Sequence, residues 1–296
     1  MSLVKSHGRD FFFKYFGFDG AQKTLEKRTF LYKSPTFFND PFDSQITLQP
    51  GISEEEMKNI FFETIADAVL DRSPNPRLGL TEAVLATMPL HLNRKGLYNI
   101  KDVLLANLSP DYFTRALQIA AKEQSKYFQE NFVFCVTEDH DNLLMWSHYA
   151  DEHQGAVFKI KCIEEKQSLL CASLKVEYKN KYPILGDNND WINLIKHGQF
   201  PDLTRTYHEL ILTKSTDWYY ENEWRMIFPR PEDSGKKIVY LGFHQEEIEC
   251  VFLGCRMSEE NKSQLINLTT SKYPSAKIFQ ARRSKTEFRL HFDEIN

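Results

Sequence analysis

Residues 53–130 form a long block of helical sequence between two groups of strand-like segments. Ser53 and Glu56 have the capping-box spacing that begins a helix. Apolar residues then recur at helical spacing: Met57, Ile60, Phe61, Ile65 and Val69. Three segments complete the block: a proline-rich connector over 72–79, a short helix over Thr81–Met88, and a helix of about 20 residues from Ser109 to Glu130. A regular alternation of strands and helices has no place for such a block.

Short apolar runs flank this block and predict strands. Two precede it, over Phe11–Phe16 and Thr29–Lys33. Eight follow it: Phe132–Val136, Gly155–Ile160, Leu174–Tyr178, Trp224–Phe228, Lys237–Leu241, Ile248–Leu253, Lys277–Ala281 and Thr286–Phe292. Further helices are predicted over Leu143–Asp151, Asp190–His197, Leu203–Leu212 and Ser258–Lys272. We therefore expect an α+β fold with a mixed, largely antiparallel sheet or sheets. We also expect residues 1–296 to form a single domain, with a helical insertion over about 53–130 after the first two strands.

The charge balance gives no overall attraction to polyanions. The chain has 37 basic and 41 acidic residues, a net charge of −4, which argues against nucleic acid as a partner. No apolar run approaches the roughly 20 residues that cross a bilayer, so we expect no membrane partner. The first residues lack the apolar core of a signal peptide. The 5 Cys residues lack metal-type paired spacing. We expect a reduced, soluble, cytoplasmic protein; the oligomeric state stays open.

The stretch 142–160 concentrates side chains suited to a binding site: Trp146, His148, Tyr149, Asp151 and His153. Residues three or four apart share a helical face, so Trp146 and Tyr149 are expected to form an aromatic stripe. Ser147 and His148 are neighbours and cannot cooperate as nucleophile and base, and no GxSxG elbow is present. His153 is expected to lie at the end of this helix. His148 is equally consistent with a structural histidine and with a pocket residue.

Glu221, Glu223 and Arg225 alternate along a predicted strand and would share one of its faces. They form either a salt-bridge ladder or a site. In a site, a glutamate could orient a ribose hydroxyl or stabilise a developing cation, and Arg225 could bind phosphate through both arms of its guanidinium. Because Trp224 and Met226 take the opposite face, toward the core, we favour a site.

The loop SPTFFNDPFD, residues 34–43, carries Asn39, Asp40 and Asp43. Two carboxylates in a rigid loop could bind a divalent cation, but such residues more often cap the backbone of their own loop. The sequence also lacks the Walker A, GxGxxG and HExxH patterns. We therefore favour the structural interpretation of this loop and predict no metal site.

Three motifs together resemble a widespread prokaryotic family known only as domain of unknown function 2971. The family pattern has an early Lys-Tyr, an FNDPF loop, W-S-x-Y-A-x-x-H-x-G and a late E-x-E-W-R. These are matched by Lys14–Tyr15, Phe38–Phe42, Trp146–Gly155 and Glu221–Arg225. The resemblance extends from about residue 11 to residue 255. It implies no established reaction.

A weaker analogy links the chain to ADP-ribosyltransferase-like folds, which place a basic residue on an early strand, an aromatic residue on a later one and a glutamate on a late one. The counterparts here would be Lys14 or Tyr15, then Tyr32 or Tyr149, and then Glu221 or Glu223. The sequence departs from that pattern in having no His or Arg at the first position, and in its large helical insertion.

These observations lead to one predicted site and three hypotheses for it. The predicted catalytic residues are Glu223, Glu221 and His148, and the predicted ligand-binding residues are Lys14, Tyr15, Asn39, Asp40, Trp146, Tyr149 and Arg225. The first hypothesis is an enzyme that acts on a nucleotide-like ligand, with NAD as the candidate co-substrate of a glycosyl or ADP-ribosyl transfer. The second is a non-catalytic module that binds a nucleotide or small effector. The third is a metal-dependent phosphodiesterase that joins Asp40 or Asp43 to the two glutamates.

Overall fold

The computed structural model describes residues 5–43, 51–75, 80–107, 111–184, 187–199, 203–229 and 237–295. The chain forms two compact units, which are described separately. Unit 1 consists of Met1–Gln45, Phe128–Lys181 and Ile211–Asn296. Unit 2 consists of Ile46–Tyr127 and Tyr182–Leu210, so it contains nearly all of the expected helical insertion and a second excursion of the chain.

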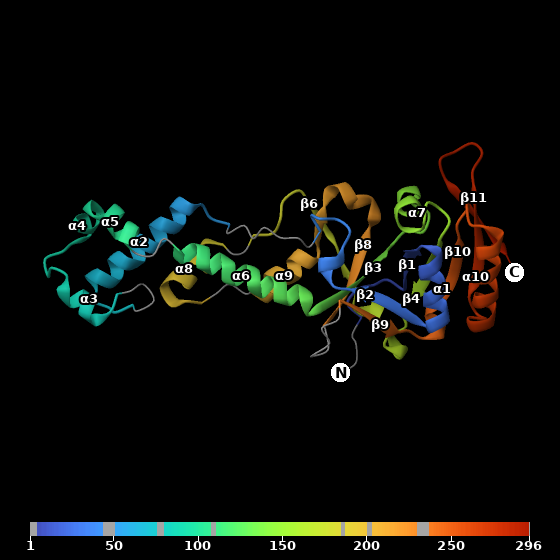
Figure 1. Cartoon of the computed structure of the whole chain (residues 1–296), viewed down its shortest axis with the longest axis horizontal. Helices are drawn as coiled ribbons and strands as arrows, with labels where there is room; N and C mark the ends of the chain where they lie inside the picture. Colours follow the sequence, from blue (N-terminus) through green and yellow to red (C-terminus); the bar gives the residue numbers. More distant parts are fainter. Residues whose placement is uncertain are drawn as a thin grey trace. The chain divides into compact units, whose positions relative to one another are not determined.

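Unit 1 is built on a sheet of 10 strands in its described part (Figure 1). The strands are β1 (Phe11–Phe16), β2 (Thr29–Lys33), β3 (Asn131–Thr137), β4 (Ala156–Lys161), β5 (Leu174–Lys175), β8 (Glu223–Pro229), β9 (Ile238–Gly242), β10 (Ile248–Leu253), β11 (Lys277–Arg283) and β12 (Leu290–Ile295). Their main order is β12-β11-β10-β4-β1-β3-β2-β9, and β8 joins β3 to β5. Within this sheet only the β10–β11 pair is parallel. The predicted α+β fold with a mixed, largely antiparallel sheet is confirmed.

The sheet opens where β1 and β2 diverge from β3. One edge of β3 pairs with β8 along its whole length, from Asn131 to Thr137. The other edge pairs with β1 at Thr137 and with β2 at Val133, a single register position in each case. The middle of that edge therefore has no strand ladder, and buried carbonyl groups there require other donors. This opening between β1 and β2 positions the candidate site.

Three helices and several short 3-10 turns cover the sheet of unit 1. They are α1 (Phe18–Lys27), α7 (Leu143–Tyr149) and α10 (Glu259–Lys272), with η1 (Pro35–Phe37), η3 (Glu164–Lys166), η4 (Leu169–Ala172), η5 (Thr216–Glu221) and η6 (Gln245–Glu247). Helix α1 packs on α10, where the Tyr273 hydroxyl donates to the Leu25 carbonyl at 2.9 Å. A separate two-stranded parallel sheet pairs β6 (Glu177–Lys179) with β7 (Thr213–Ser215).

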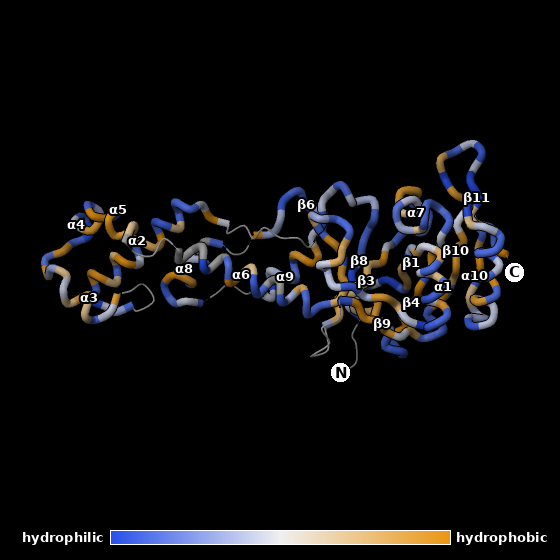
Figure 2. Tube along the Cα trace, in the orientation of Figure 1, coloured by the Kyte–Doolittle hydropathy of each residue, from blue (hydrophilic) through white to orange (hydrophobic). Residues whose placement is uncertain are grey.

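The apolar core of unit 1 follows the strand runs that the sequence indicated. Figure 2 shows hydrophobic residues along β3, β4 and β10. Phe132, Phe158 and Val251 are fully buried on these strands, and Phe12 is fully buried on β1. Apolar burial of this kind is the main favourable contribution to folding. The sheet is therefore the rigid support on which the site residues are carried.

Helix α7 is shorter than the predicted helix Leu143–Asp151, because the chain leaves helical geometry after Tyr149. Asp151, Glu152 and His153 then have φ angles of 44°, 51° and 69°, a left-handed turn without glycine. The backbone of this turn is held by hydrogen bonds from His153 N to the Trp146 carbonyl (3.1 Å) and from Gly155 N to the Ala150 carbonyl (2.8 Å). Left-handed non-glycine residues persist only where the surroundings enforce them.

The described helices of unit 2 are α2 (Glu54–Leu70), α3 (Glu82–Thr87), α4 (Arg94–Asn99), α5 (Lys101–Asn107) and α8 (Asn188–His197), together with most of α6 (Asp111–Gln129) and α9 (Leu203–Ile211). Ser53 and Glu56 form both halves of the predicted capping box. The predicted start of α6 at Ser109–Pro110, and residues 76–79 of the connector, lie outside the described residues. In the part of the chain that the structure describes, no helix is long and apolar enough to cross a membrane.

Candidate functional site

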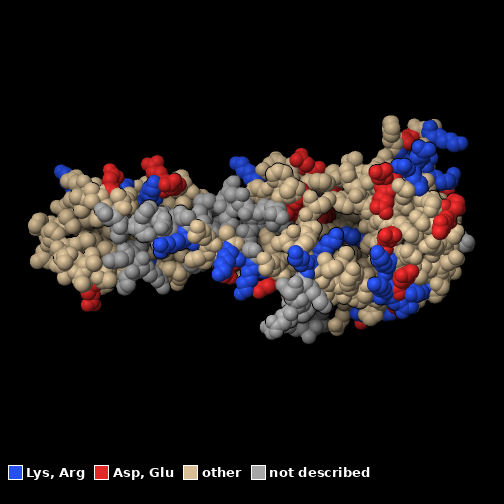
Figure 3. Space-filling model, viewed as in Figure 1, with Lys and Arg blue, Asp and Glu red and all other residues tan. Residues whose placement is uncertain are grey.

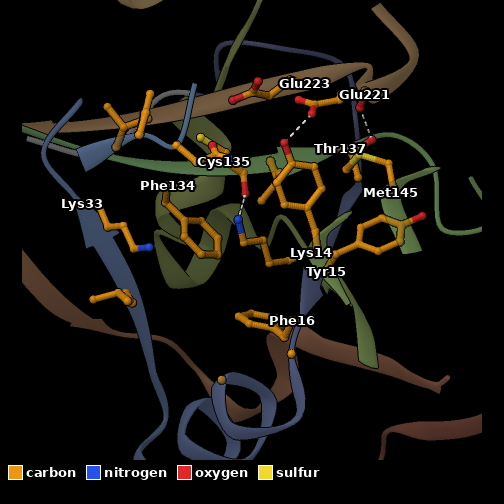
Figure 4. Close-up of a pocket in the computed structure, with 18 of the residues that line it drawn as sticks. Lys14, Tyr15, Phe16, Lys33, Phe134, Cys135, Thr137, Met145, Glu221 and Glu223 are labelled. Atoms are coloured by element: carbon orange, nitrogen blue, oxygen red, sulfur yellow. Dashed lines mark hydrogen bonds between the residues drawn. The ribbon is translucent and has the colours of Figure 1, made fainter. Parts of the chain in front are cut away.

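A cavity of about 510 Å³ lies in the opening between β1 and β2. Its floor is β3, and its walls come from α1, the loop 34–43, α7 and the segment 214–223. Figure 3 shows a hollow on this face of unit 1 with basic atoms along one side. In Figure 4, Glu221 and Glu223 lie above β3, whereas Lys14 and Lys33 lie below it. The volume suits a small-molecule ligand, for which typical pockets measure roughly 300–1,000 Å³.

Lys214 joins the two glutamates at the acidic end of the cavity. It lies on β7 and is 7% exposed. Its Nζ donates to Glu221 Oε2 and, at 2.9 Å, to Glu223 Oε2. Asp43 Oδ2 is 3.9 Å away. One ammonium group therefore compensates neighbouring buried carboxylates, which would otherwise repel each other.

Arg225 is fully buried and donates hydrogen bonds to the same group of carboxylates. Its Nε donates to Glu223 Oε1 at 2.8 Å, and its terminal nitrogens bind both Asp43 oxygens at 3.0 and 2.5 Å. The remaining N–H groups reach Glu223 Oε2 (3.2 Å) and the Ile211 carbonyl. All five guanidinium donors are therefore used by the protein. Arg225 does not line the cavity. Its guanidinium group therefore has no donor left over for the phosphate that was considered as its ligand.

Glu221 lies in η5 rather than on β8, which corrects the expectation that three charged residues alternate along one strand. Asn222 takes a left-handed conformation, with φ 42°, between Glu221 and Glu223. The Thr137 hydroxyl donates to the Glu221 carbonyl at 2.5 Å. The Tyr178 hydroxyl accepts from Glu223 N at 2.8 Å. These backbone contacts fix both glutamates so that their carboxylates meet at Lys214.

Helix α7 contributes the aromatic wall beside Glu221. The Tyr149 hydroxyl donates to Glu221 Oε1 at 2.6 Å. Trp146 is buried behind the wall, and its Nε1 donates to the His140 carbonyl at 2.8 Å. His153 stacks on the Trp146 ring at 6.0 Å. A β-carbon on Gly155 would lie 2.0 Å from the Phe16 carbonyl oxygen, so this position requires glycine. Most of the W-S-x-Y-A-x-x-H-x-G motif thus serves to place Tyr149.

The two glutamates differ in electrostatic environment. Burial and the neighbouring Glu223 raise the pKa of Glu221, although Lys214 and the Tyr149 hydroxyl act in the opposite direction. Burial also acts to raise the pKa of Glu223, but Arg225 and Lys214 outweigh it and hold that pKa well below its usual range. Burial lowers the pKa of Lys214, and the two glutamates more than offset this, so it stays charged. Glu223 is therefore a fixed anion, whereas Glu221 takes up a proton more readily.

The opposite end of the cavity is basic. Lys14, Lys23 and Lys33 line it, and none of them has a carboxylate within 4.0 Å among the described residues. The Lys14 ammonium donates to the Cys135 carbonyl at 2.6 Å, in the stretch of β3 without a strand partner. Burial lowers the pKa of Lys14, and the Lys33 ammonium adds to this effect. Within the described residues, the basic charges of this end therefore lack a carboxylate counter-ion.

The structure brings some of the predicted site residues to the cavity and leaves others elsewhere. Those that line it are Lys14, Tyr15, Asn39, His148, Tyr149, Glu221 and Glu223. Trp146 and Arg225 lie behind its walls. Asp40 is buried in its own loop, where its Oδ1 accepts from Phe42 N at 2.8 Å, the capping role favoured from the sequence. Tyr32, the other aromatic candidate of the ADP-ribosyltransferase analogy, is a fully buried core residue.

Sequence reasoning missed Lys214 entirely, and for Asp43 it favoured a capping role in its own loop, with metal binding as the alternative. Asp43, Glu221 and Glu223 do converge, but they converge around Lys214 and Arg225. Among the residues that the structure describes, no group of three or more His, Cys, Asp or Glu side chains could hold a metal ion. The two basic side chains occupy the place that a metal would take in the phosphodiesterase hypothesis.

A family model described as "Protein of unknown function (DUF2971)" matches residues 145–226. The early motifs, Lys14–Tyr15 and Phe38–Phe42, lie outside the matched segment. Comparison with curated proteins and with solved structures gave no match. The matched segment runs from α7 to β8 and carries Tyr149, Lys214 and both glutamates. Over these residues the chain is similar to the DUF2971 family, the resemblance that its motifs indicated.

Proposed function

We propose that this protein is an enzyme that breaks the N-glycosidic bond of a phosphorylated nucleotide, with NAD as the candidate substrate, and transfers the ADP-ribosyl group to an acceptor. The observation that carries the proposal is the polarity of the cavity. Two buried glutamates share Lys214 at one end, and the other end is lined by three lysines that have no carboxylate partner in the described part of the chain.

The basic end suits the phosphates of a dinucleotide. Ammonium groups form charge-assisted hydrogen bonds to phosphate oxygens, and these are stronger where water is partly excluded. Lys14 donates one N–H group to the Cys135 carbonyl, and its ammonium group has two further N–H donors that a ligand could accept from. Phe38 and Phe134 also line the cavity and offer apolar surface to a base or a ribose.

The acidic end suits the glycosidic bond. When that bond breaks, its electron pair leaves with the nicotinamide nitrogen, and positive charge develops on the ribose. Glu223, held as an anion, stabilises this charge. Glu221, whose pKa is raised, accepts the proton of the attacking acceptor as the new bond to the ribose forms. Neighbouring carboxylates with pKa values pushed apart are typical of such a division of roles.

The test measures by chromatography how much nicotinamide is released from NAD. NAD that carries a label on the adenine is used in parallel, so that the transferred ADP-ribosyl group can be detected. Glu221→Gln keeps the shape of the side chain and removes its basicity, so we expect turnover to fall by about 10²- to 10⁴-fold. Glu138→Gln is the matched control, because Glu138 is a partly buried carboxylate that contacts the Trp224 indole outside the cavity. If Glu221→Gln and the wild type release nicotinamide at equal rates, Glu221 has no part in the reaction.

One observation favours binding without turnover as the second candidate function. Every carboxylate oxygen of Glu221 and Glu223 already accepts a hydrogen bond from Tyr149, Lys214 or Arg225. A non-catalytic module would use these groups only to shape the cavity. Thermal-shift screening with NAD, ADP-ribose and ATP, followed by analysis of the recovered ligand, separates the two functions. Saturable stabilisation with intact NAD supports the binding module.

A further inference from the structure

The buried ion network of the site is attached to the points where the chain leaves and re-enters unit 1. Asp43 lies two residues before Gln45, the end of the first segment of unit 1, and Ile211 begins its third segment. Arg225 binds both the Asp43 carboxylate and the Ile211 carbonyl. Lys214 follows Ile211 by three residues and holds the two glutamates.

The two other junctions are also tied to segments that line the cavity. Ser34, at the start of the loop that ends at Asp43, donates to the Phe128 carbonyl at 2.8 Å, and Phe128 begins the second segment of unit 1. Thr216, the first residue of η5, donates to the side chain of Asn180, next to the end of that segment. At or near each of the four junctions between unit 1 and unit 2, a residue of unit 1 is therefore hydrogen-bonded to another residue of unit 1 close to the site.

We infer that Asp43 is a positioning residue that fixes Glu223 through Arg225. The role in turnover rests on the proposed function. Both oxygens of Asp43 bind the guanidinium group, whose planar shape leaves little freedom of rotation. A second edge of the same planar group, formed by Nε and a terminal nitrogen, donates to both oxygens of Glu223. A displacement of one carboxylate therefore moves the other.

The magnitude follows from the sensitivity of catalysis to placement. A shift of about 1 Å in a catalytic group can lower the rate by about 10²-fold. Asp43→Asn keeps the shape and removes the charge, so one side of the guanidinium loses its charge-assisted pair. We expect kcat to fall at least about tenfold while KM changes less than about threefold, since the basic end of the cavity is untouched. Asp43→Glu restores the charge and is expected to recover part of kcat.

The experiment compares wild type, Asp43→Asn, Asp43→Glu and the control Glu138→Gln by hydrogen–deuterium exchange and by NAD kinetics. Each protein is studied well below its melting temperature. For Asp43→Asn we expect faster exchange in peptides that cover 211–215 and 221–226, with the sheet strands β10 and β11 unchanged. Glu138→Gln is expected to exchange in these peptides and turn over NAD as the wild type does. If Asp43→Asn does not fold, Asp43→Glu carries the test, because its extra methylene still displaces the guanidinium group.

Two results would overturn the inference. One is that residues 221–226 of Asp43→Asn exchange hydrogen at the wild-type rate. If Asp43→Asn does not fold, the same result for Asp43→Glu would overturn the inference. The other is a loss of kcat no larger than that of Glu138→Gln. Absence of nicotinamide release by the wild type refutes the proposed function instead, and the exchange measurement then still decides whether Asp43 holds Glu223.

Discussion

Replacing each of the two glutamates by glutamine is expected to change the free energy of unfolding with opposite pH dependence. Glu221 and Glu223 are two residues apart, and both are buried. Substitution of either by Gln removes one negative charge without changing the shape of the side chain. Glu223 compensates Arg225 and shares Lys214, whereas the hydrogen bonds of the Glu221 carboxylate to described residues come from Lys214 and the neutral Tyr149 hydroxyl. The pair therefore measures how much each carboxylate contributes to the ion network.

The expected magnitudes differ by several kcal/mol. Removing one partner of a buried ion pair typically costs about 3–5 kcal/mol, and this applies to Glu223→Gln because fully buried Arg225 loses two hydrogen bonds to a carboxylate. For a unit of this size that corresponds to a fall in Tm on the order of 10 °C. Glu221→Gln leaves Lys214 paired with Glu223 and still offers an amide oxygen, so we expect a change within about 1 kcal/mol.

The pH dependence of unfolding supplies a second difference. The pKa of Glu221 is raised above its ordinary value of 4.5, so its ionisation opposes folding, and stability is lost as the pH rises through the folded pKa. Glu221→Gln should therefore gain stability relative to the wild type as the pH rises above 4.5. The pKa of Glu223 is depressed, so its contribution is present above 4.5 and is lost as the pH falls below this value. The deficit of Glu223→Gln should therefore shrink in acid.

The assay is urea unfolding, followed by tryptophan fluorescence, at pH values from about 4 to 8, where these carboxylates titrate. The slope of each transition should stay at the wild-type value, so that a shifted midpoint reports stability. Equal destabilisation by the two substitutions at neutral pH would refute the assignment of Glu223 as the fixed anion. A Glu221→Gln variant that loses stability with rising pH would refute the raised pKa of Glu221.

Three further substitutions test other parts of the site. Tyr149→Phe removes a hydrogen bond that lowers the pKa of Glu221, so the acid limb of the kcat–pH profile should move to higher pH. Gly155→Ala places a methyl group 2.0 Å from the Phe16 carbonyl oxygen and should destabilise unit 1 by about 3 kcal/mol, measured by thermal unfolding. Lys33→Met should weaken ADP-ribose binding several-fold and reduce its dependence on salt, measured by calorimetry from about 0.05 to 0.5 M NaCl.

Much of the sheet could be predicted because its strands are short apolar runs with clear ends. β1, β2 and β10 have the predicted bounds. Helix α1 could not be predicted, because it begins at Phe18 after Gly17 and has no side-chain cap. Strand β12 begins at Leu290 rather than at the predicted Thr286. There the Ser284 hydroxyl accepts from the Thr286 and Glu287 amides and closes a hairpin loop. Such local contacts compete with the apolar pattern and are not encoded in its periodicity.

The position of the site was partly predictable, since Tyr149, Glu221 and Glu223 were chosen for their residue types and spacing. The geometry behind that choice was only partly right. Alternation along one strand was expected to bring the glutamates together, but Glu221 lies in η5, and the left-handed Asn222 places the two side chains side by side. A left-handed turn at asparagine is common, but the sequence does not show which asparagine will adopt one.

Charge balance offers a rule that would have indicated the missing residue. A buried carboxylate must be paired or neutralised, because transfer of an unpaired charge from water costs far more than a fold can compensate. Glu221, Glu223 and Arg225 buried together leave one unpaired negative charge, and the arrival of Asp43 leaves two. At least one further cation from elsewhere in the chain is therefore required. The sequence cannot say which lysine supplies it, because Lys214 reaches the site through the parallel pairing of β7 with β6, and two such short strands carry no recognisable pattern.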